Sequence, residues 1–261
     1  MTDSIRTAEI RLAGADGDEI SAYFAQPDTD SNAIPGAVPA DATPPGGRGG
    51  VVLIHHMPGF DRWSKEVARR FAVDGYNVVA PNLFWRDAPG ADPDDAAAAA
   101  RARGGVPDDR LVGDVGAAVD YLRALPTSNG KVGLIGHCSG GRQTVLAACN
   151  LHVDAAVDCY GAFVVGTAPD GFPVKMKGLE DQLANLSCPL LGMFGIEDTY
   201  PSPDQVAELD RLLTGHSKQH DFHSYEGAGH GFFGTDRPAY RVEAATDGYT
   251  KIDAFFAQHL A

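Results

Sequence analysis

The sequence lacks the features that mark several classes of protein. None of its apolar stretches approaches the ~20 residues that a membrane-spanning helix needs. Its opening, MTDSIRTAEI, has no basic segment followed by an apolar one, so we expect no secretory signal. The only cysteines are Cys138, Cys149, Cys159 and Cys188, without a CxxC pair. We therefore expect reduced thiols in a cytoplasmic protein rather than a disulfide framework.

Basic residues are also scarce. The chain has 21 Lys and Arg against 35 Asp and Glu, a formal net charge of −14. A surface this acidic repels phosphate backbones and anionic lipids, which argues against a nucleic-acid or membrane-surface partner. With 261 residues, 44% of them hydrophobic, the chain can bury a substantial core without disulfide or metal, and we expect residues 1–261 to form a single domain.

The hydrophobic pattern predicts a mixed α/β fold. Two alternating segments, Thr7–Leu12 and Glu19–Ala25, indicate an antiparallel hairpin, and the Pro- and Gly-rich residues 27–50 indicate a surface loop. Short apolar runs then alternate with amphipathic segments. The expected strands are Val51–His56, Tyr76–Ala80, Lys131–Ile135, Ala155–Tyr160, Pro189–Phe194 and Gln219–Tyr225, and the expected helices are Arg62–Asp74, 94–103, Asp108–Leu125, Gly140–Asn150, Ser202–Leu213 and Ala239–Leu260. This alternation predicts a mostly parallel sheet with helices on both faces and the hairpin at its N-terminal end.

One strand is followed by a motif typical of a nucleophile. Gly136-His137-Cys138-Ser139-Gly140 matches G-x-C-x-G at a strand-to-helix turn, where glycines are needed because a Cβ would clash. A nucleophilic Ser139 would need glycine where His137 stands, and the glycine spacing does not fit the G-x-G-x-x-G of a dinucleotide site. The alternative is a buried structural cysteine. The following helix N-terminus lowers a thiol pKa, which favours Cys138 as nucleophile.

A base and an acid follow later strands. Asp198 comes after the next-to-last expected strand and His230 after the last one, which gives the order Cys138, Asp198, His230 of α/β-hydrolases. Glu197 is the alternative to Asp198 as the acid. The remaining histidines without comparable context are His137, His152, His216, His220, His223 and His259. We expect surface or core roles for these.

The loop after the strand that begins at Val51 supplies further candidates. The backbone N–H groups of Met57 and Ser139 are expected to form an oxyanion hole, since this fold takes one donor after the nucleophile and one from that loop. The adjacent His55 and His56 could suggest a metal site. Neighbouring strand residues point to opposite faces, however, and no H-x-x-x-H or CxxC accompanies them, so we expect no metal.

Five segments together resemble one known family. These are HHMPG (55–59), PNLFWR (81–86), GHCSGG (136–141), GIEDTYPSP (195–203) and GAGHGF (227–232). The chain from about Ile20 to its end resembles the dienelactone hydrolase, or carboxymethylenebutenolidase-like, family. The resemblance implies an α/β-hydrolase fold, a Cys138–Asp198–His230 triad, no cofactor, and hydrolysis of a small-molecule lactone or ester.

The sequence departs from the family pattern at substrate-binding positions. Where the family has a Glu thought to interact with the resting thiol, this chain has His56. Arg86 matches an arginine that helps to hold a substrate carboxylate, with a surface salt bridge as the alternative. A second such arginine, expected shortly after His230, is replaced, since the residues that follow are Gly231-Phe232-Phe233-Gly234; whether Arg237, a little later, takes its place is left open by the sequence. These departures affect the expected substrate rather than the reaction.

The sequence thus predicts acyl transfer to water through a Cys138 thioester. Trp85, Tyr160 and Phe232 are candidates to line the substrate pocket, with core packing as the alternative for each. A broader carboxylesterase or thioesterase is the alternative enzyme, and a non-catalytic binding protein with this fold is the alternative outside enzymes. The chain could be a monomer or a homodimer.

Overall fold

The computed structural model describes residues 5–28 and 46–261, and its centre is a sheet in the order β1-β2-β4-β3-β5-β6-β7-β8. The strands are β1 (Ile5–Ala13), β2 (Glu19–Pro27), β3 (Arg48–Ile54), β4 (Asn77–Pro81), β5 (Ser128–His137), β6 (Ala155–Cys159), β7 (Leu190–Gly195) and β8 (His220–Tyr225). β1 and β2 are antiparallel, β2 joins β4 antiparallel, and the neighbours from β4 to β8 are parallel. The predicted fold class, with its N-terminal hairpin, is confirmed.

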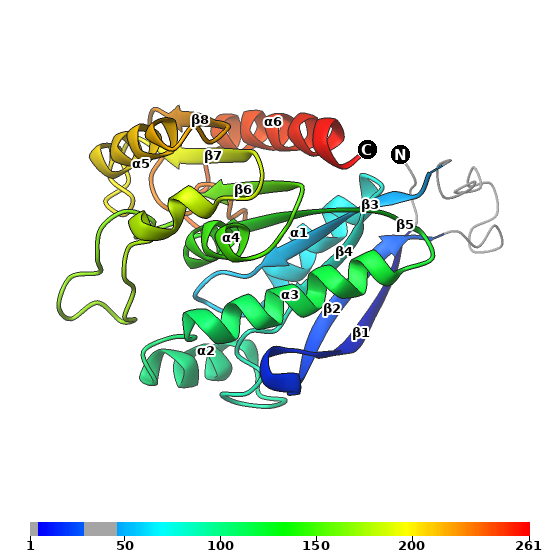
Figure 1. Cartoon of the computed structure of the whole chain (residues 1–261). Helices are drawn as coiled ribbons and strands as arrows, with labels where there is room; N and C mark the ends of the chain where they lie inside the picture. The colour runs from blue at the N-terminus through cyan, green and yellow to red at the C-terminus, as the bar shows by residue number, and fades with distance from the viewer. Residues whose placement is uncertain (1–4, 29–45) are drawn as a thin grey trace.

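Helices cover both faces of this sheet (Figure 1). On one face lie α1 (Arg62–Val73) and α6 (Val242–Leu260); on the other lie α2 (Pro93–Ala102), α3 (Asp108–Ala124), α4 (Ser139–Asn150) and α5 (Pro203–Gly215). Short 3-10 helices occur at Ala15–Gly17 and Glu180–Asn185. Among the described residues, no helix is both long and apolar enough to cross a membrane.

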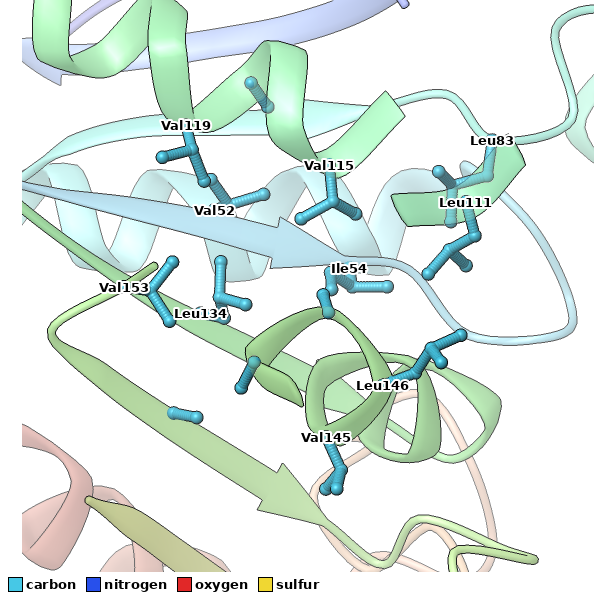
Figure 2. Packing of buried hydrophobic residues seen from close by; sticks show 14 of the residues in the cluster. Val52, Ile54, Leu83, Leu111, Val115, Val119, Leu134, Val145, Leu146 and Val153 are labelled. Carbon is cyan, nitrogen blue, oxygen red and sulfur yellow. The ribbon is translucent and has the colours of Figure 1, made fainter. Parts of the chain in front are cut away.

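The largest apolar core fills the space between the sheet and α3 and α4. Figure 2 shows Val52 and Ile54 of β3 facing Val115 and Val119 of α3, with Leu146 of α4 nearby. Each fully buried side chain of this kind stabilises the fold by roughly 1.5–3 kcal/mol. This packing fixes the carboxyl ends of β3 and β5, where the candidate site residues begin.

Some element boundaries differ from the sequence-based expectation. β3 ends at Ile54, so the two following histidines lie in a loop rather than in the strand. The expected surface loop at 27–50 is shorter at both ends, because Pro27 pairs with Ile5 in the hairpin and Arg48 pairs with Ser128 of β5. The rest of that predicted loop, residues 29–45, lies outside the described residues.

Candidate active site

Cys138 occupies a sharp turn between β5 and α4. Its φ of 58° and ψ of −124° lie in the left-handed region, a strained backbone conformation for a residue other than glycine. A Cβ on Gly136 would lie 2.0 Å from the Gly140 carbonyl oxygen, and one on Gly140 would lie 2.3 Å from the Ile54 carbonyl oxygen. The predicted need for glycine on both sides is therefore confirmed. The Cys138 N–H donates to the Cys159 carbonyl at 3.0 Å, which anchors the turn to β6.

His230 and Asp198 lie in two adjacent loops beyond the same edge of the sheet. Asp198 follows β7, and His230 follows β8. Nδ1 of His230 donates to Oδ2 of Asp198 at 2.8 Å, and the Asp198 side chain is only 2% exposed. The Glu197 N–H donates to the Ala228 carbonyl at 2.9 Å and ties the two loops together, while its side chain is exposed. The geometry therefore favours Asp198 over Glu197 as the partner of the imidazole.

The thiol and the imidazole perturb each other. Burial opposes ionisation of Cys138, but a hydrogen bond and the charge of His230, with backbone N–H groups of Ser139 and Met57, bring the pKa of the thiol below its usual value. Burial also disfavours the charged form of His230, but its hydrogen bonds to Asp198 and Cys138 raise its pKa to about 10. Each group therefore stabilises the charged form of the other, the thiolate of Cys138 and the imidazolium of His230.

The two predicted backbone donors converge on the sulfur. Met57 follows β3, and Ser139 is the first residue of α4, so β3 and β5 together bring both N–H groups within hydrogen-bond reach of the Cys138 thiol. The N-terminus of α4 adds a partial positive charge at this point. The arrangement can stabilise negative charge that develops next to the sulfur.

Two cavities meet at Cys138 and His230. The first cavity has a volume of about 430 Å³ and the second about 400 Å³. The first is lined by Met57, Arg101, Cys138, Ser139, Ala162, Phe172, Pro173, Met176, Glu197, Asp198, Thr199, Tyr200 and His230. The second is lined by His56, Pro58, Trp63, Cys138, Tyr160, His230, Gly231, Gly234, Arg237, Pro238 and Ala239. Either can hold part of a small organic substrate.

Two of the predicted substrate-binding residues lie at the second cavity. Nε2 of His56 is 2.7 Å from Oδ2 of Asp61, and its ring packs 5.1 Å from that of Trp63. Burial raises the thiol pKa, and the groups that lower it most are His230 and the backbone N–H groups of Ser139 and Met57 rather than His56. The Tyr160 ring lies 5.1 Å from the His230 ring and is almost fully buried, so it forms a wall behind the imidazole.

The structure places Arg86 away from both cavities. Its Nη1 and Nη2 contact the two carboxylate oxygens of Asp114 at 2.7 and 3.0 Å, and its Nε lies 3.1 Å from Asp18. Asp114 is fully buried, and it also accepts the Ala15 N–H at 2.9 Å. Arg86 thus ties the β1–β2 turn to α3. Arg86 was expected either to hold a substrate carboxylate or to form a salt bridge. The structure contains the salt bridge, because the guanidinium N–H groups of Arg86 point to the carboxylates of Asp114 and Asp18.

Trp85 and Phe232 also lie outside the cavities that contain Cys138. The guanidinium of Arg11 lies 4.3 Å from the centre of the Trp85 ring, and Trp85 lines a separate, smaller cavity. Phe232 is fully buried and stacks on Phe233 at 4.6 Å. For both residues the packing role replaces the expected contact with substrate, because their rings are held against neighbouring side chains.

Several residues of the first cavity were missed by the sequence-based prediction. The segment after β6 carries Phe172, Pro173 and Met176 over the cavity, and Phe163 packs against Phe172 at 4.9 Å and Tyr200 at 5.0 Å. This segment has no regular period, so nothing in its pattern indicated that it covers the site. Its Gly-Phe-Pro at 171–173 is a weak signal only.

His55 and His56 do not form a metal site. Nδ1 of His55 donates to the His56 carbonyl at 3.0 Å, and its Nε2 accepts the Leu83 N–H at 3.1 Å. Burial lowers the pKa of His55 to about 4, so the ring is neutral. Within residues 5–28 and 46–261, no group of three or more His, Cys, Asp or Glu side chains is arranged to hold a metal ion.

The fold and the turn at Cys138 define an α/β-hydrolase. The chain belongs to the dienelactone hydrolase family, whose model matches residues 37–260. A Pseudomonas putida carboxymethylenebutenolidase is 33% identical over 207 residues, which cover 75% of this chain and 79% of that protein.

Solved structures share the fold. A metagenomic protein described as a dienelactone hydrolase-like promiscuous phosphotriesterase has a TM-score of 0.74 at 19% identity, with 99% of this chain and 100% of that one covered. An acylaminoacyl peptidase from Pyrococcus horikoshii has a TM-score of 0.69 at 17% identity, over 100% of this chain and 42% of that one. At these identities the likeness concerns the fold alone.

Proposed function

We propose that this protein hydrolyses small-molecule esters or lactones with Cys138 as the nucleophile, His230 as the general base and acid, and Asp198 as the residue that orients the imidazole. The observation that carries the proposal is the hydrogen-bonded series from Cys138 through His230 to the buried Asp198. Membership in a family of hydrolases supports the same reaction class.

In the first half of the reaction, the Cys138 thiolate attacks the substrate carbonyl carbon and forms a C–S bond. The negative charge moves to the carbonyl oxygen, where the N–H groups of Met57 and Ser139 stabilise it, each by ~3 kcal/mol in comparable sites. His230 then donates its proton to the departing alkoxide oxygen as the C–O bond breaks. A thioester on Cys138 and the free alcohol group remain; for a lactone, both belong to one molecule.

In the second half, neutral His230 removes a proton from water, and the hydroxide attacks the thioester carbonyl. The C–S bond breaks, and Cys138 leaves as a thiolate beside the imidazolium that has just formed. The acid product departs, and the starting ion pair is restored. Asp198 keeps Nδ1 protonated throughout, so that Nε2 faces the reacting groups.

One observation favours a broader esterase or thioesterase as the second candidate. Arg86, the expected contact for a substrate carboxylate, is bound to Asp114 instead, and most of the surface that lines the first cavity is apolar. A dienelactone compared with its uncharged ester analogue distinguishes the two activities. A strong preference for the dienelactone supports the narrower one, and similar rates support the broader one.

Hydrolysis of 4-nitrophenyl acetate by the Cys138→Ala variant tests the proposal. We expect turnover to fall at least ~1,000-fold, since the nucleophile is removed, while the circular dichroism spectrum stays the same. Cys188→Ala is the matched control, because this buried thiol lies outside both cavities and should leave turnover unchanged. Retention of most activity by Cys138→Ala, or no hydrolysis of any ester by the wild type, contradicts the proposal. The second result instead points to a binding protein.

A further inference from the structure

Among the residues that the structure describes, Arg101 is the one arginine that lines the first cavity. It lies in the last turn of α2, half-buried, and shares the cavity with Cys138 and His230. Across the described parts of the chain, no carboxylate lies within ion-pair distance of its guanidinium, and its side chain makes no hydrogen bond. The five N–H donors of its guanidinium therefore have no protein partner among the described residues, and the residue lines the same cavity as the candidate nucleophile.

Nearby arginines are arranged differently. Arg103, two residues further on, and Arg110 both pair with Asp87 at 3.4 and 2.8 Å, and Arg142 pairs with Asp108 at 3.0 Å. The chain has 35 acidic and 21 basic residues, so acidic partners are plentiful. Arg101 differs from these three arginines in having no acidic partner in the described part of the chain, while its side chain lines the cavity.

The cavity walls increase the effect of this charge. Ala162, Phe172, Pro173 and Met176 are apolar, and a cation and a bound anion attract each other more strongly beside apolar walls than in bulk water. Glu197 also lines the cavity, but its side chain is exposed and forms no ion pair with Arg101 among the described contacts. Arg101 thus remains available to an anionic ligand.

We propose that Arg101 binds a carboxylate of the substrate and makes the first cavity selective for esters or lactones that carry a negative charge on their acid or alcohol part. This inference rests on the proposed hydrolase function. The expected contact with a substrate carboxylate is thus made by Arg101 on α2 instead of by Arg86. A purely structural Arg101, which only offsets the dipole at the end of α2, would have no effect on substrate choice.

Matched pairs of substrates test the inference. In one pair the acid part carries the charge (4-nitrophenyl hydrogen glutarate against 4-nitrophenyl pentanoate), and in the other the alcohol part does (4-acetoxybenzoate against phenyl acetate). The readout is selectivity, the ratio of kcat/KM for the anionic and neutral members. In at least one pair, Arg101→Gln should lower this ratio by about 10- to 100-fold, as expected for a lost charge-assisted contact, and Arg101→Lys should restore part of it.

Arg103→Gln is the matched control, because it removes the same charge from the same end of α2 but lies outside the cavity. Its selectivity should stay within about twofold of the wild type. Unchanged selectivity of Arg101→Gln in both pairs, or an equal fall in Arg103→Gln, overturns the inference while leaving the proposed function intact. If the wild type hydrolyses neither member of either pair, the proposed function itself fails.

Discussion

Replacing Asp198 by Asn tests how the acid acts on the imidazole. Oδ1 of Asp198 accepts the Tyr200 N–H at 2.9 Å, while Oδ2 accepts from Nδ1 of His230 at 2.8 Å. An Asn side chain has one oxygen only, and the Tyr200 N–H holds that oxygen at the Oδ1 position. Its NH₂ group must then face Nδ1 of His230, which moves the imidazole proton to Nε2.

The consequence is large because this tautomer cannot take a proton from Cys138. We expect kcat/KM for 4-nitrophenyl acetate to fall about 1,000- to 10,000-fold, as for the equivalent change in a serine protease triad. At about 1.4 kcal/mol for each tenfold loss, this corresponds to roughly 4–5.5 kcal/mol of transition-state stabilisation. Little structural change is expected, since the two side chains have the same shape.

The control is Glu197→Gln, the adjacent residue that sequence reasoning left as the alternative acid. Its side chain is exposed and makes no contact with His230 among the described hydrogen bonds, so its kcat/KM should change by less than about threefold. Thermal unfolding followed by circular dichroism checks that both variants are folded. A loss below tenfold in Asp198→Asn, or an equal loss in Glu197→Gln, would refute this account of the acid.

Three further experiments test other parts of the structure. Iodoacetamide should inactivate the wild type at a rate that stays high when the pH falls below ~8.5, the pKa of an ordinary thiol, because His230 stabilises the Cys138 thiolate. A rate that rises only near pH 8.5 would contradict this. Arg86→Met should lower the free energy of unfolding by about 3–5 kcal/mol, since it leaves the Asp114 charge buried and unpaired, without changing preference between anionic and neutral esters. Denaturant unfolding measures the free energy of unfolding, and the substrate pairs above measure the preference between anionic and neutral esters. Burial lowers the pKa of His137 to about 3, so the unfolded state binds the extra proton as the pH falls from 6.5. As the pH falls from 6 to 4, the free energy of unfolding of the wild type should therefore decrease relative to that of His137→Phe, by up to about 1.4 kcal/mol per pH unit. If the free energies of unfolding of the two proteins change in parallel with pH, His137 does not destabilise the fold in acid.

The order of strands and helices could be predicted because it depends on local signals. Period-2 alternation marked β1 and β2, and short apolar runs between amphipathic segments marked the parallel strands. The turn at Cys138 was equally readable, since glycine at 136 and 140 is required by carbonyl oxygens within 2.0–2.3 Å of where a Cβ would lie. A steric requirement at one position restricts which residue type can stand there, so it can be recognised in the sequence.

The contacts of individual side chains could not be predicted in the same way. Arg86 follows β4, close in sequence to the site, but Asp114 on α3 turns its guanidinium toward the β1–β2 hairpin. Arg101 carries no motif, and it reaches the cavity on α2, which packs against Gly59 in the loop after β3. Such placements depend on how distant elements pack, which residue spacing along one segment does not encode.

The most direct test of the central claim is the mass of the covalent intermediate. The wild type is mixed with excess 4-nitrophenyl acetate, quenched with acid within the first turnovers, digested and analysed by mass spectrometry. We expect an acetyl group on the peptide that contains Cys138, labile to hydroxylamine, and its accumulation in His230→Ala should be slower. Turnover of the ester with no acyl group on Cys138 at any quench time, or an acyl group on another residue, would contradict the account.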